Sequence, residues 1–152
     1  MTLQVNGEEH SVRSHPRAAL LWVLRDEIGC SSVKYGCGAG QCGACRVVID
    51  GTLSYSCLVT VAETDGREVR TLEGYIADGT ADPIVDALLA LDAGQCGYCL
   101  PGIAITLTLL RERTAAPTRA ELMRSLDDHL CRCGAHSRIV SAACSALGIG
   151  DG

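Results

Sequence analysis

Short stretches of alternating or β-branched residues, separated by turn signals, predict strands in the first half of the chain. Residues 2–5 alternate, Asn6-Gly7 is a strong two-residue turn, and residues 9–13 can return as the second strand of a hairpin. The β-branched run at residues 46–49 and the turn Asp50-Gly51 predict a second hairpin.

A helix is predicted between the two hairpins. Apolar residues recur at helical spacing from Leu21 to Ile28, Pro16 suits the first turn, and Gly29 offers a C-terminal stop. A further strand is expected at residues 67–72. Two hairpins, a helix and this strand predict a small α+β domain.

The second half of the chain changes to helical periodicity. Residues 74–81 contain Gly, Asp and Thr without any period, and we interpret them as a linker between domains at residues 1–75 and 76–152. Asp82 as N-cap, with Pro83 at the first helical position, opens the first helix of the second domain.

Three more helices are predicted after it. Pro101 starts the second, which ends at the loop of residues 114–117, and Thr118 with Glu121 gives the capping-box signature of the third. The fourth is striped with apolar residues over positions 139–147. Short connections make successive helices antiparallel neighbours, so the first and third connections lie at the same end of this four-helix bundle.

These two connections carry four cysteines. Cys96 and Cys99 lie in the first, and Cys131 and Cys133 lie in the other. Topology therefore gathers four thiols at one end of the bundle. Four thiolates suit either a structural zinc ion or an iron–sulfur cluster, and this pattern alone leaves both open.

A second set of cysteines lies in the first domain. Cys37, Cys42, Cys45 and Cys57 have the C-x4-C-x2-C…C spacing of plant-type 2Fe-2S clusters. If Asp50-Gly51 forms the turn, the second hairpin places Cys57 beside Cys45. The glycines of the loop let backbone N–H groups approach cluster sulfurs. Zinc ligands typically come as two separated pairs, so this set favours a 2Fe-2S cluster, and with it a second one in the bundle.

Composition narrows the function further. Ten cysteines without a signal-peptide pattern at the N-terminus favour metal ligation over disulfides. A net charge of -5, no clustered Lys or Arg and 3% aromatic residues argue against nucleic-acid binding. The longest apolar run, residues 100–110, is too short to span a bilayer. We expect a soluble, cytoplasmic protein; export to the periplasm attached to a partner is the alternative.

Other candidate residues receive structural interpretations. Cys144 falls on the apolar stripe of the last helix and is expected to be a core thiol, and Cys30 is expected to be a loop residue. His15, His129 and His136 have no partner at a convincing spacing, so surface or capping roles are expected for them.

The two cysteine motifs together resemble the small iron–sulfur subunit of the xanthine oxidase family of molybdenum hydroxylases. The resemblance rests on the sequence YGCGAGQCGAC at residues 35–45, and on GQCGYCLPG at residues 94–102 with LCRCG at residues 130–134. It covers nearly the whole chain. It implies a β-grasp plant-type ferredoxin domain followed by a helical 2Fe-2S-binding domain.

The resemblance also implies a role in electron transfer, with no substrate chemistry on this chain. Family members carry electrons from a molybdopterin centre in a large partner subunit, through two 2Fe-2S clusters, to an acceptor. Cys96, Cys99, Cys131 and Cys133 would then hold the cluster nearer molybdenum. Gln95 matches the position that contacts the pterin, here expected as its cytosine dinucleotide, and Cys133 matches the ligand closest to it.

One departure from the family pattern bears on the acceptor. Many members have Thr-Gly-Tyr after the last ligand, whereas this chain has Gly134-Ala135-His136 and is similar here to isoquinoline and nicotinate dehydrogenase small subunits. Several of those proteins lack a flavin subunit and pass electrons to cytochromes, so the departure puts a flavin partner in doubt without excluding one. The resemblance as a whole implies FAD or a cytochrome as acceptor, and an N-heteroaromatic compound or an aldehyde as the substrate of the partner. A free-standing two-cluster ferredoxin-like carrier and a zinc-stabilised interaction module are the alternatives.

Overall fold

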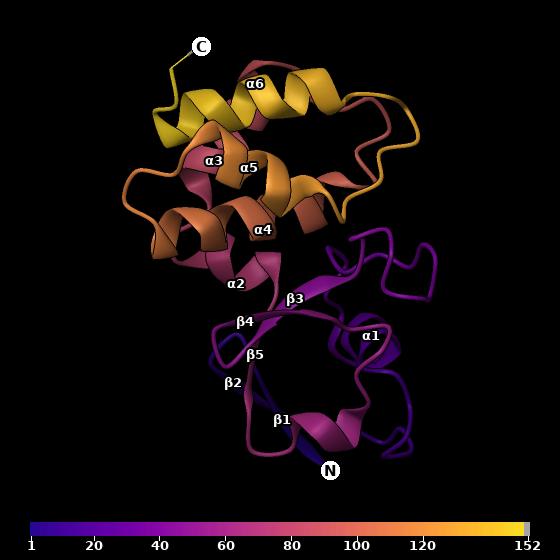
Figure 1. The fold of residues 1–152 in the computed structure, drawn as a ribbon. Helices are drawn as coiled ribbons and strands as arrows, with labels where there is room; N and C mark the ends of the chain where they lie inside the picture. The colour runs from indigo at the N-terminus through magenta and orange to yellow at the C-terminus, as the bar shows by residue number, and fades with distance from the viewer. Residues whose placement is uncertain (151–152) are drawn as a thin grey trace.

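The computed structural model describes residues 1–150, and its strands form one five-stranded mixed sheet. The strand order is β2-β1-β5-β3-β4, with β1 and β5 parallel and the other neighbours antiparallel. The sheet occupies the lower part of Figure 1. Its strands are β1 (Thr2–Val5), β2 (Glu8–Ser11), β3 (Arg46–Ile49), β4 (Thr52–Tyr55) and β5 (Glu68–Arg70).

Both predicted hairpins are confirmed. Their central residues adopt positive φ angles, 55° and 80° at Asn6 and Gly7 and 46° and 74° at Asp50 and Gly51. This is the left-handed conformation that two-residue type I′ turns require, and Asn, Asp and Gly tolerate it best. The return strand of the first hairpin ends at Ser11, two residues earlier than expected.

The first helix begins later than Pro16 suggests. It comprises α1 (Leu20–Trp22) and a π-helical continuation, η1 (Val23–Ile28). Ala19 is instead extended and pairs with Thr60 in an antiparallel bridge, so tertiary pairing holds the residues before Leu20 out of the helix.

The rest of this helix follows the prediction. Gly29 ends it with a φ of 90°, the left-handed conformation of a C-terminal glycine. A short 3-10 turn, η2 (Val61–Thr64), begins directly after Thr60. The apolar face of the helix and one face of the sheet form the ferredoxin-lobe core, which includes Leu3, Val5, Leu20, Leu21, Leu24, Val47, Ile49 and Val69.

The interpretation of residues 74–81 as a linker is wrong. Their first part belongs to helix α2 (Leu72–Ala77), which begins directly after β5. Leu72 and Tyr75 lie three residues apart on one face of this helix and are buried against the helical lobe. A helix of six residues is too short to show a periodic stripe, which is why the sequence pattern missed it.

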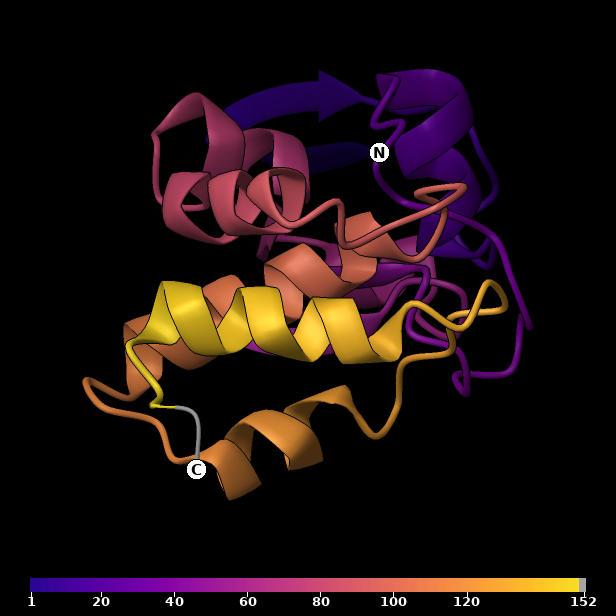
Figure 2. The ribbon, with the colours of Figure 1, turned by 90° about the horizontal axis from the view of Figure 1, so that it is seen from above.

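The remaining helices form the predicted four-helix bundle. The first helix begins at Asp82, so Ala81 rather than Asp82 stands at the N-cap position, and it makes no side-chain cap. The capping box of Thr118 and Glu121 is present. Figure 2 shows α6 lying between α3 and α5, the two helices it packs against. The four helices are α3 (Asp82–Ala90), α4 (Leu100–Arg113), α5 (Arg119–Leu126) and α6 (His136–Leu147).

Helix α4 joins the two lobes. Residues 102–109 are all buried, and α4 packs against both β3 and α5. Val48 of β3 faces this helix and belongs to the helical-lobe core with Ile103 and Leu107. The described helices include none that is long and apolar enough to cross a membrane.

Candidate metal centres

The first thiol set lies in the loop between η1 and β3 and at the end of β4. The second hairpin has the expected register, with Ile49 opposite Thr52. One step beyond the paired strands, the backbone N–H of Ser56 donates to the carbonyl oxygen of Cys45 at 3.2 Å. This pairing places Cys57 beside Cys45, and their side chains are within hydrogen-bonding contact.

Backbone N–H groups of the loop point at its sulfurs. The amides of Ala39 and Gln41 approach Cys37 Sγ at 3.4 and 3.2 Å, and the amide of Cys37 approaches Cys42 Sγ at 3.3 Å. Gly40, next to Gln41, has a φ of 66°, which lets the loop turn its amides inward. These hydrogen bonds lower the pKa of Cys37 to about 7, so the loop stabilises negative charge on sulfur.

Cys45 has the opposite electrostatic environment. Burial raises the pKa of its thiol to about 11, and the neighbouring Cys57 contributes to the rise. A thiol must lose its proton to ligate a metal, so the metal itself would have to stabilise the Cys45 thiolate.

The second thiol set lies where the α3–α4 and α5–α6 connections meet, at the end of the bundle that topology predicts. Cys96 Sγ and Cys133 Sγ are 3.5 Å apart. The side-chain amide of Gln95 donates to the carbonyl oxygen of Cys133 at 3.3 Å. This contact ties the two connections together.

The thiols of this set also differ in their electrostatic environments. The backbone N–H of Tyr98 lowers the pKa of Cys96. Burial alone would raise the pKa of Cys131, but hydrogen bonds led by the amide of Ala135 outweigh it and lower the pKa. Burial and the nearby Cys131 raise the pKa of Cys99 to about 12. As in the first set, hydrogen bonds lower the pKa of the more exposed thiols, whereas burial raises the pKa of a buried one.

The two thiol sets share one cavity and one direct backbone contact. The cavity has a volume of about 360 Å³ and its lining is almost entirely apolar. The amide of Leu130 donates to the carbonyl oxygen of Cys42 at 3.1 Å, which joins the segment before Cys131 to the first loop. The residues lining the cavity include Gly36, Cys37, Cys42, Cys96, Tyr98, Cys99 and Cys131.

His129 is a site residue that the sequence analysis missed, and its expected surface or capping role is wrong. Its side chain is buried, and its Nε2 lies 2.9 Å from the Thr106 hydroxyl. That hydroxyl donates to the carbonyl oxygen of Gly102, so His129 Nε2 must donate to Thr106. Burial lowers the pKa of His129 to about 4, in agreement with a neutral ring. Its ring lies over Gly43, where an added Cβ would collide with Nδ1.

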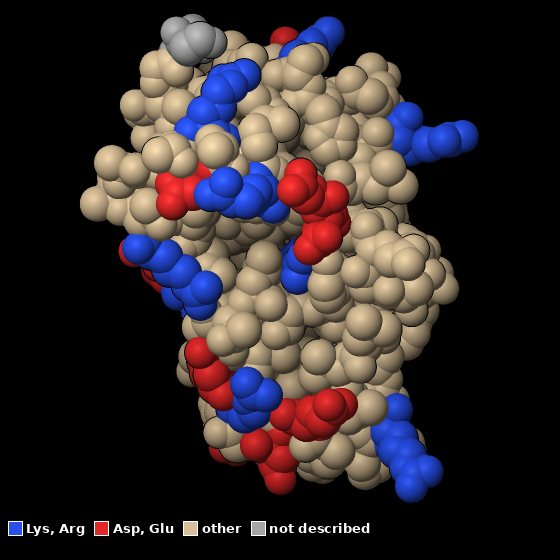
Figure 3. Space-filling view, viewed as in Figure 1, with Lys and Arg blue, Asp and Glu red and all other residues tan. Residues whose placement is uncertain are grey.

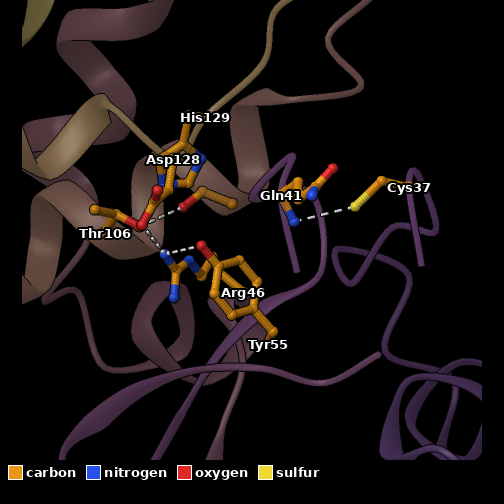
Figure 4. Close-up of polar contacts among 8 residues, drawn as sticks. Cys37, Gln41, Arg46, Tyr55, Thr106, Asp128 and His129 are labelled. Atoms are coloured by element: carbon orange, nitrogen blue, oxygen red, sulfur yellow. Dashed lines mark hydrogen bonds and ion pairs between the residues drawn. The ribbon is translucent and has the colours of Figure 1, made fainter. Parts of the chain in front are cut away.

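Arg46 forms a further link between the lobes. Its guanidinium donates to Asp128 at 3.1 Å and to the Tyr55 hydroxyl at 2.6 Å, and it stacks over the Tyr55 ring (Figure 4). The side chain of Arg46 is only 9% exposed. Arg46 follows Cys45 and Asp128 precedes Cys131 by three residues, so this ion pair stands beside both thiol sets. Arg46 is recognisable in the sequence as the neighbour of a cysteine, but its pairing with Asp128 depends on how the lobes dock.

The other candidates have structural roles. Cys144 is a buried core thiol, as expected, and accepts a hydrogen bond from Arg119 at 3.3 Å. Cys30 follows η1 but is buried in the ferredoxin-lobe core. His136 Nε2 accepts from the amide of Cys131 at 3.2 Å, which is a capping role within the last connection. His15 accepts from a nearby amide at the surface.

The residues of both sets fit a pair of iron–sulfur clusters by their chemistry. Each set offers four thiols and backbone N–H groups directed at sulfur, which are the ligands and hydrogen bonds that such clusters use. Within residues 1–150, no three His, Cys, Asp or Glu side chains surround a single-ion position. The loop of residues 35–45 and the two cysteine-bearing bundle connections lie on one side of Figure 1, where Figure 3 shows few charged side chains.

Comparisons with known proteins agree with this chemistry. Residues 3–73 match the model of the family described as a 2Fe-2S iron–sulfur cluster binding domain. Residues 71–144 match the model of the [2Fe-2S] binding domain. The two matches together cover most of the chain.

Relatives and solved structures extend the match. The small FeS subunit of nicotinate dehydrogenase from Eubacterium barkeri is 36% identical, over 93% of this chain and 90% of that protein. The small subunit of nicotine 6-hydroxylase from Paenarthrobacter nicotinovorans is 37% identical, over 96% of this chain and 88% of that protein. The aldehyde oxidoreductase of Desulfovibrio desulfuricans superimposes with a TM-score of 0.87 at 34% identity, covering 97% of this chain but 17% of that one.

These matches decide the fold and the family. The expected α+β fold, a ferredoxin domain followed by a helical 2Fe-2S domain, is confirmed by the two family models and by the superposition. The chain belongs to the small iron–sulfur subunits of the xanthine oxidase family of molybdenum hydroxylases.

Proposed function

We propose that this chain is the electron-transfer subunit of a molybdenum hydroxylase, passing electrons from a molybdopterin centre in a large partner subunit to an acceptor. When bound, two 2Fe-2S clusters would supply the one-electron redox chemistry. The chain itself would position them, shield them and set their surroundings. The observation that carries this proposal is that two four-thiol sets lie close together, with cysteines of both sets lining one cavity.

Each set would hold one cluster. The ferredoxin-lobe cluster would be held by Cys37, Cys42, Cys45 and Cys57, and the helical-lobe cluster by Cys96, Cys99, Cys131 and Cys133. The backbone amides that donate to Cys37 Sγ and Cys42 Sγ support the first assignment, because they stabilise the charged form of sulfur. The contact between Cys96 and Cys133 supports the second.

The backbone hydrogen bond from Leu130 to Cys42 supports electron transfer within the chain. It connects the residue before Cys131 to a thiol-bearing residue of the other set through few covalent bonds and one hydrogen bond. A carrier of single electrons needs such closely spaced centres. A structural metal module does not.

Gln95 and Cys133 would face the molybdopterin of the partner. Both are near the surface at the bundle end, and the Gln95 amide is fixed by its contact with the Cys133 carbonyl. Leu130 is 63% exposed and Tyr98 48% exposed on the same cysteine-bearing segments. Large exposed apolar groups beside a redox site favour a subunit that a partner covers over a free-standing ferredoxin-like carrier.

The finer assignments follow the relatives. The nicotinate dehydrogenase and nicotine hydroxylase relatives favour an N-heteroaromatic substrate on the partner, and the aldehyde oxidoreductase suggests an aldehyde as the second class. We propose the cytosine dinucleotide form of molybdopterin, and FAD or a cytochrome as acceptor. We also propose a cytoplasmic location, with export attached to a partner as the alternative.

The test is purification of the chain from its native host with its partners, followed by metal and cofactor analysis. We expect about four iron atoms per chain, two for each 2Fe-2S cluster, together with molybdenum and pterin. Flavin or haem in the same complex would identify the acceptor. Zinc in place of iron, or a redox-active monomer recovered repeatedly without molybdenum, would contradict the proposal.

A further inference from the structure

Tyr98 makes a side-chain hydrogen bond between the two thiol-bearing parts of the chain. It lies between Cys96 and Cys99 in the α3–α4 connection. Its hydroxyl donates to the carbonyl oxygen of Tyr35 at 2.6 Å. Tyr35 precedes Cys37 by two residues, so the bond connects the turn of one thiol set to the start of the loop that carries the other.

The same residue contributes to the helical-lobe set through its backbone. The N–H of Tyr98 is a hydrogen-bond donor to Cys96. Tyr98 also lines the shared cavity, together with cysteines of both sets. One residue therefore contacts a thiol of its own turn and the backbone of the opposite loop.

Tyr35 itself contacts its own loop and the first helix. Its ring packs over Gly38, where an added Cβ would lie 3.0 Å from the Tyr35 hydroxyl. The Tyr35 ring also packs against the ring of Trp22 in α1, with the ring centroids 5.1 Å apart. The carbonyl that accepts from Tyr98 thus belongs to a residue that is fixed to both the loop and the first helix.

A second contact between the segments, from Leu130 to Cys42, is made by backbone atoms alone. It holds the loop at Cys42, seven residues after Tyr35, whereas the start of the loop is tied to its end only within the loop, by the amide of Lys34 donating to the carbonyl oxygen of Ala44 at 3.0 Å and that of Cys37 to Cys42 Sγ at 3.3 Å. The Tyr98 hydroxyl adds a direct hydrogen bond from the helical lobe to the start of the loop. The ring is also close to the ammonium group of Lys34, which is 5.9 Å from its centroid.

We propose that Tyr98 is a positioning residue that sets the placement of the Cys37 loop relative to the helical-lobe thiols, and thereby the magnetic and electronic coupling between the two centres. This inference rests on the proposed function, since it concerns the clusters that the thiols would hold. The positioning role belongs to the Tyr98 hydroxyl, and not to its ring or its backbone N–H.

The variant Tyr98→Phe removes only that hydroxyl and keeps the ring and the amide. Two readouts apply to the full chain purified with its clusters. Hydrogen exchange of residues 35–42 should accelerate several-fold, because each lost tertiary contact raises the frequency of local opening. The splitting between the electron paramagnetic resonance signals of the two reduced clusters should narrow or broaden, while the helical-lobe signal keeps its own g-values.

Tyr75→Phe is the matched control. Tyr75 is buried in the helical-lobe core beneath Arg70, and it takes no part in the cavity lining. The Tyr75→Phe variant should leave both the hydrogen exchange and the signal splitting unchanged. If Tyr98→Phe has wild-type exchange and wild-type splitting, the positioning role is refuted. Absence of iron signals from the wild-type protein would instead refute the proposed function, so the two failures are distinguishable.

Discussion

Gly102 of α4 packs directly against the carbonyl oxygen of Gly43, so closely that a Cβ on Gly102 would overlap it. Gly43 lies between Cys42 and Cys45, and Gly102 lies three residues after Cys99. The two lobes therefore meet here in a glycine–glycine contact beside both thiol sets. No larger residue would let the lobes come so near.

Gly102→Ala should weaken this docking. The added methyl group meets backbone atoms that cannot rotate away, and overpacking of this kind costs about 1–3 kcal/mol. We expect a lower midpoint of chemical unfolding and less iron retained on gel filtration. Gly150→Ala is the control, because a Cβ at Gly150 meets nothing within 4 Å. Equal stability of the two variants would show that the lobes are not held together here.

The two thiol sets should respond separately to substitution. Cys57→Ser should disturb the electron paramagnetic resonance signal of one cluster, and Cys96→Ser that of the other. The reason is that Cys57 lies beside Cys45, whereas Cys96 contacts Cys133. Cys144→Ser, in a buried thiol outside both sets, should leave both signals intact. Loss of both signals in either ligand variant would contradict the ligand assignment.

Much of this arrangement could be predicted from local pattern. Asn6-Gly7 and Asp50-Gly51 each require positive φ angles, so the sequence specifies both hairpins and the register that brings Cys57 to Cys45. The meeting of the two bundle connections follows from the order and length of the helices. Both are consequences of short-range rules, and both proved correct.

The parts that could not be predicted depend on tertiary contact. The extended backbone of Ala19 is imposed by Thr60, about forty residues away in sequence. Helix α2 is stabilised by burial of Leu72 and Tyr75 against the helical lobe rather than by its own pattern. The burial of His129 needs Gly43 and Thr106, from two other segments. A single sequence carries no record of such pairings.

Glu73 should make stability depend on pH in the acidic range. Burial alone would raise its pKa, but hydrogen bonds from Ser32 and Thr71 outweigh burial and lower the pKa below its usual value. A carboxyl with a lowered pKa stabilises the fold above its unfolded-state value near 4.5, and the contribution is lost as the pH falls through the folded-state value.

Glu73→Gln should therefore cost about 1–2 kcal/mol at pH 7, toward the lower end for hydrogen bonds to a charged group, because the glutamine oxygen can still accept some of them. The difference from wild type should shrink as the pH is lowered below 4.5. Urea unfolding of the full chain at a series of pH values measures this. Glu112→Gln, at an exposed carboxyl, is the control and should show no such convergence. A constant difference across the series would contradict the role of the Glu73 charge.

Thr106→Val should test the hydrogen bonds that hold His129 against the ferredoxin lobe. Valine preserves the shape of the side chain but leaves His129 Nε2 without an acceptor in a buried site, which costs about 1–3 kcal/mol. Thr106→Ser keeps the hydroxyl and should lose less stability. Thr108 is equally buried two residues further along α4, and its hydroxyl has no partner within residues 1–150, so Thr108→Val should be neutral or stabilising.

The comparison of these three variants by chemical unfolding separates the hydroxyl of Thr106 from a general effect of valine in α4. Hydrogen exchange at residues 42–46 adds a local readout, because the His129 ring lies over Gly43 and would be free to move away once its hydrogen bond is lost. We expect faster exchange in Thr106→Val alone. If Thr106→Val and Thr108→Val behave alike in both measurements, the Thr106–His129 bond does not support the contact between the lobes.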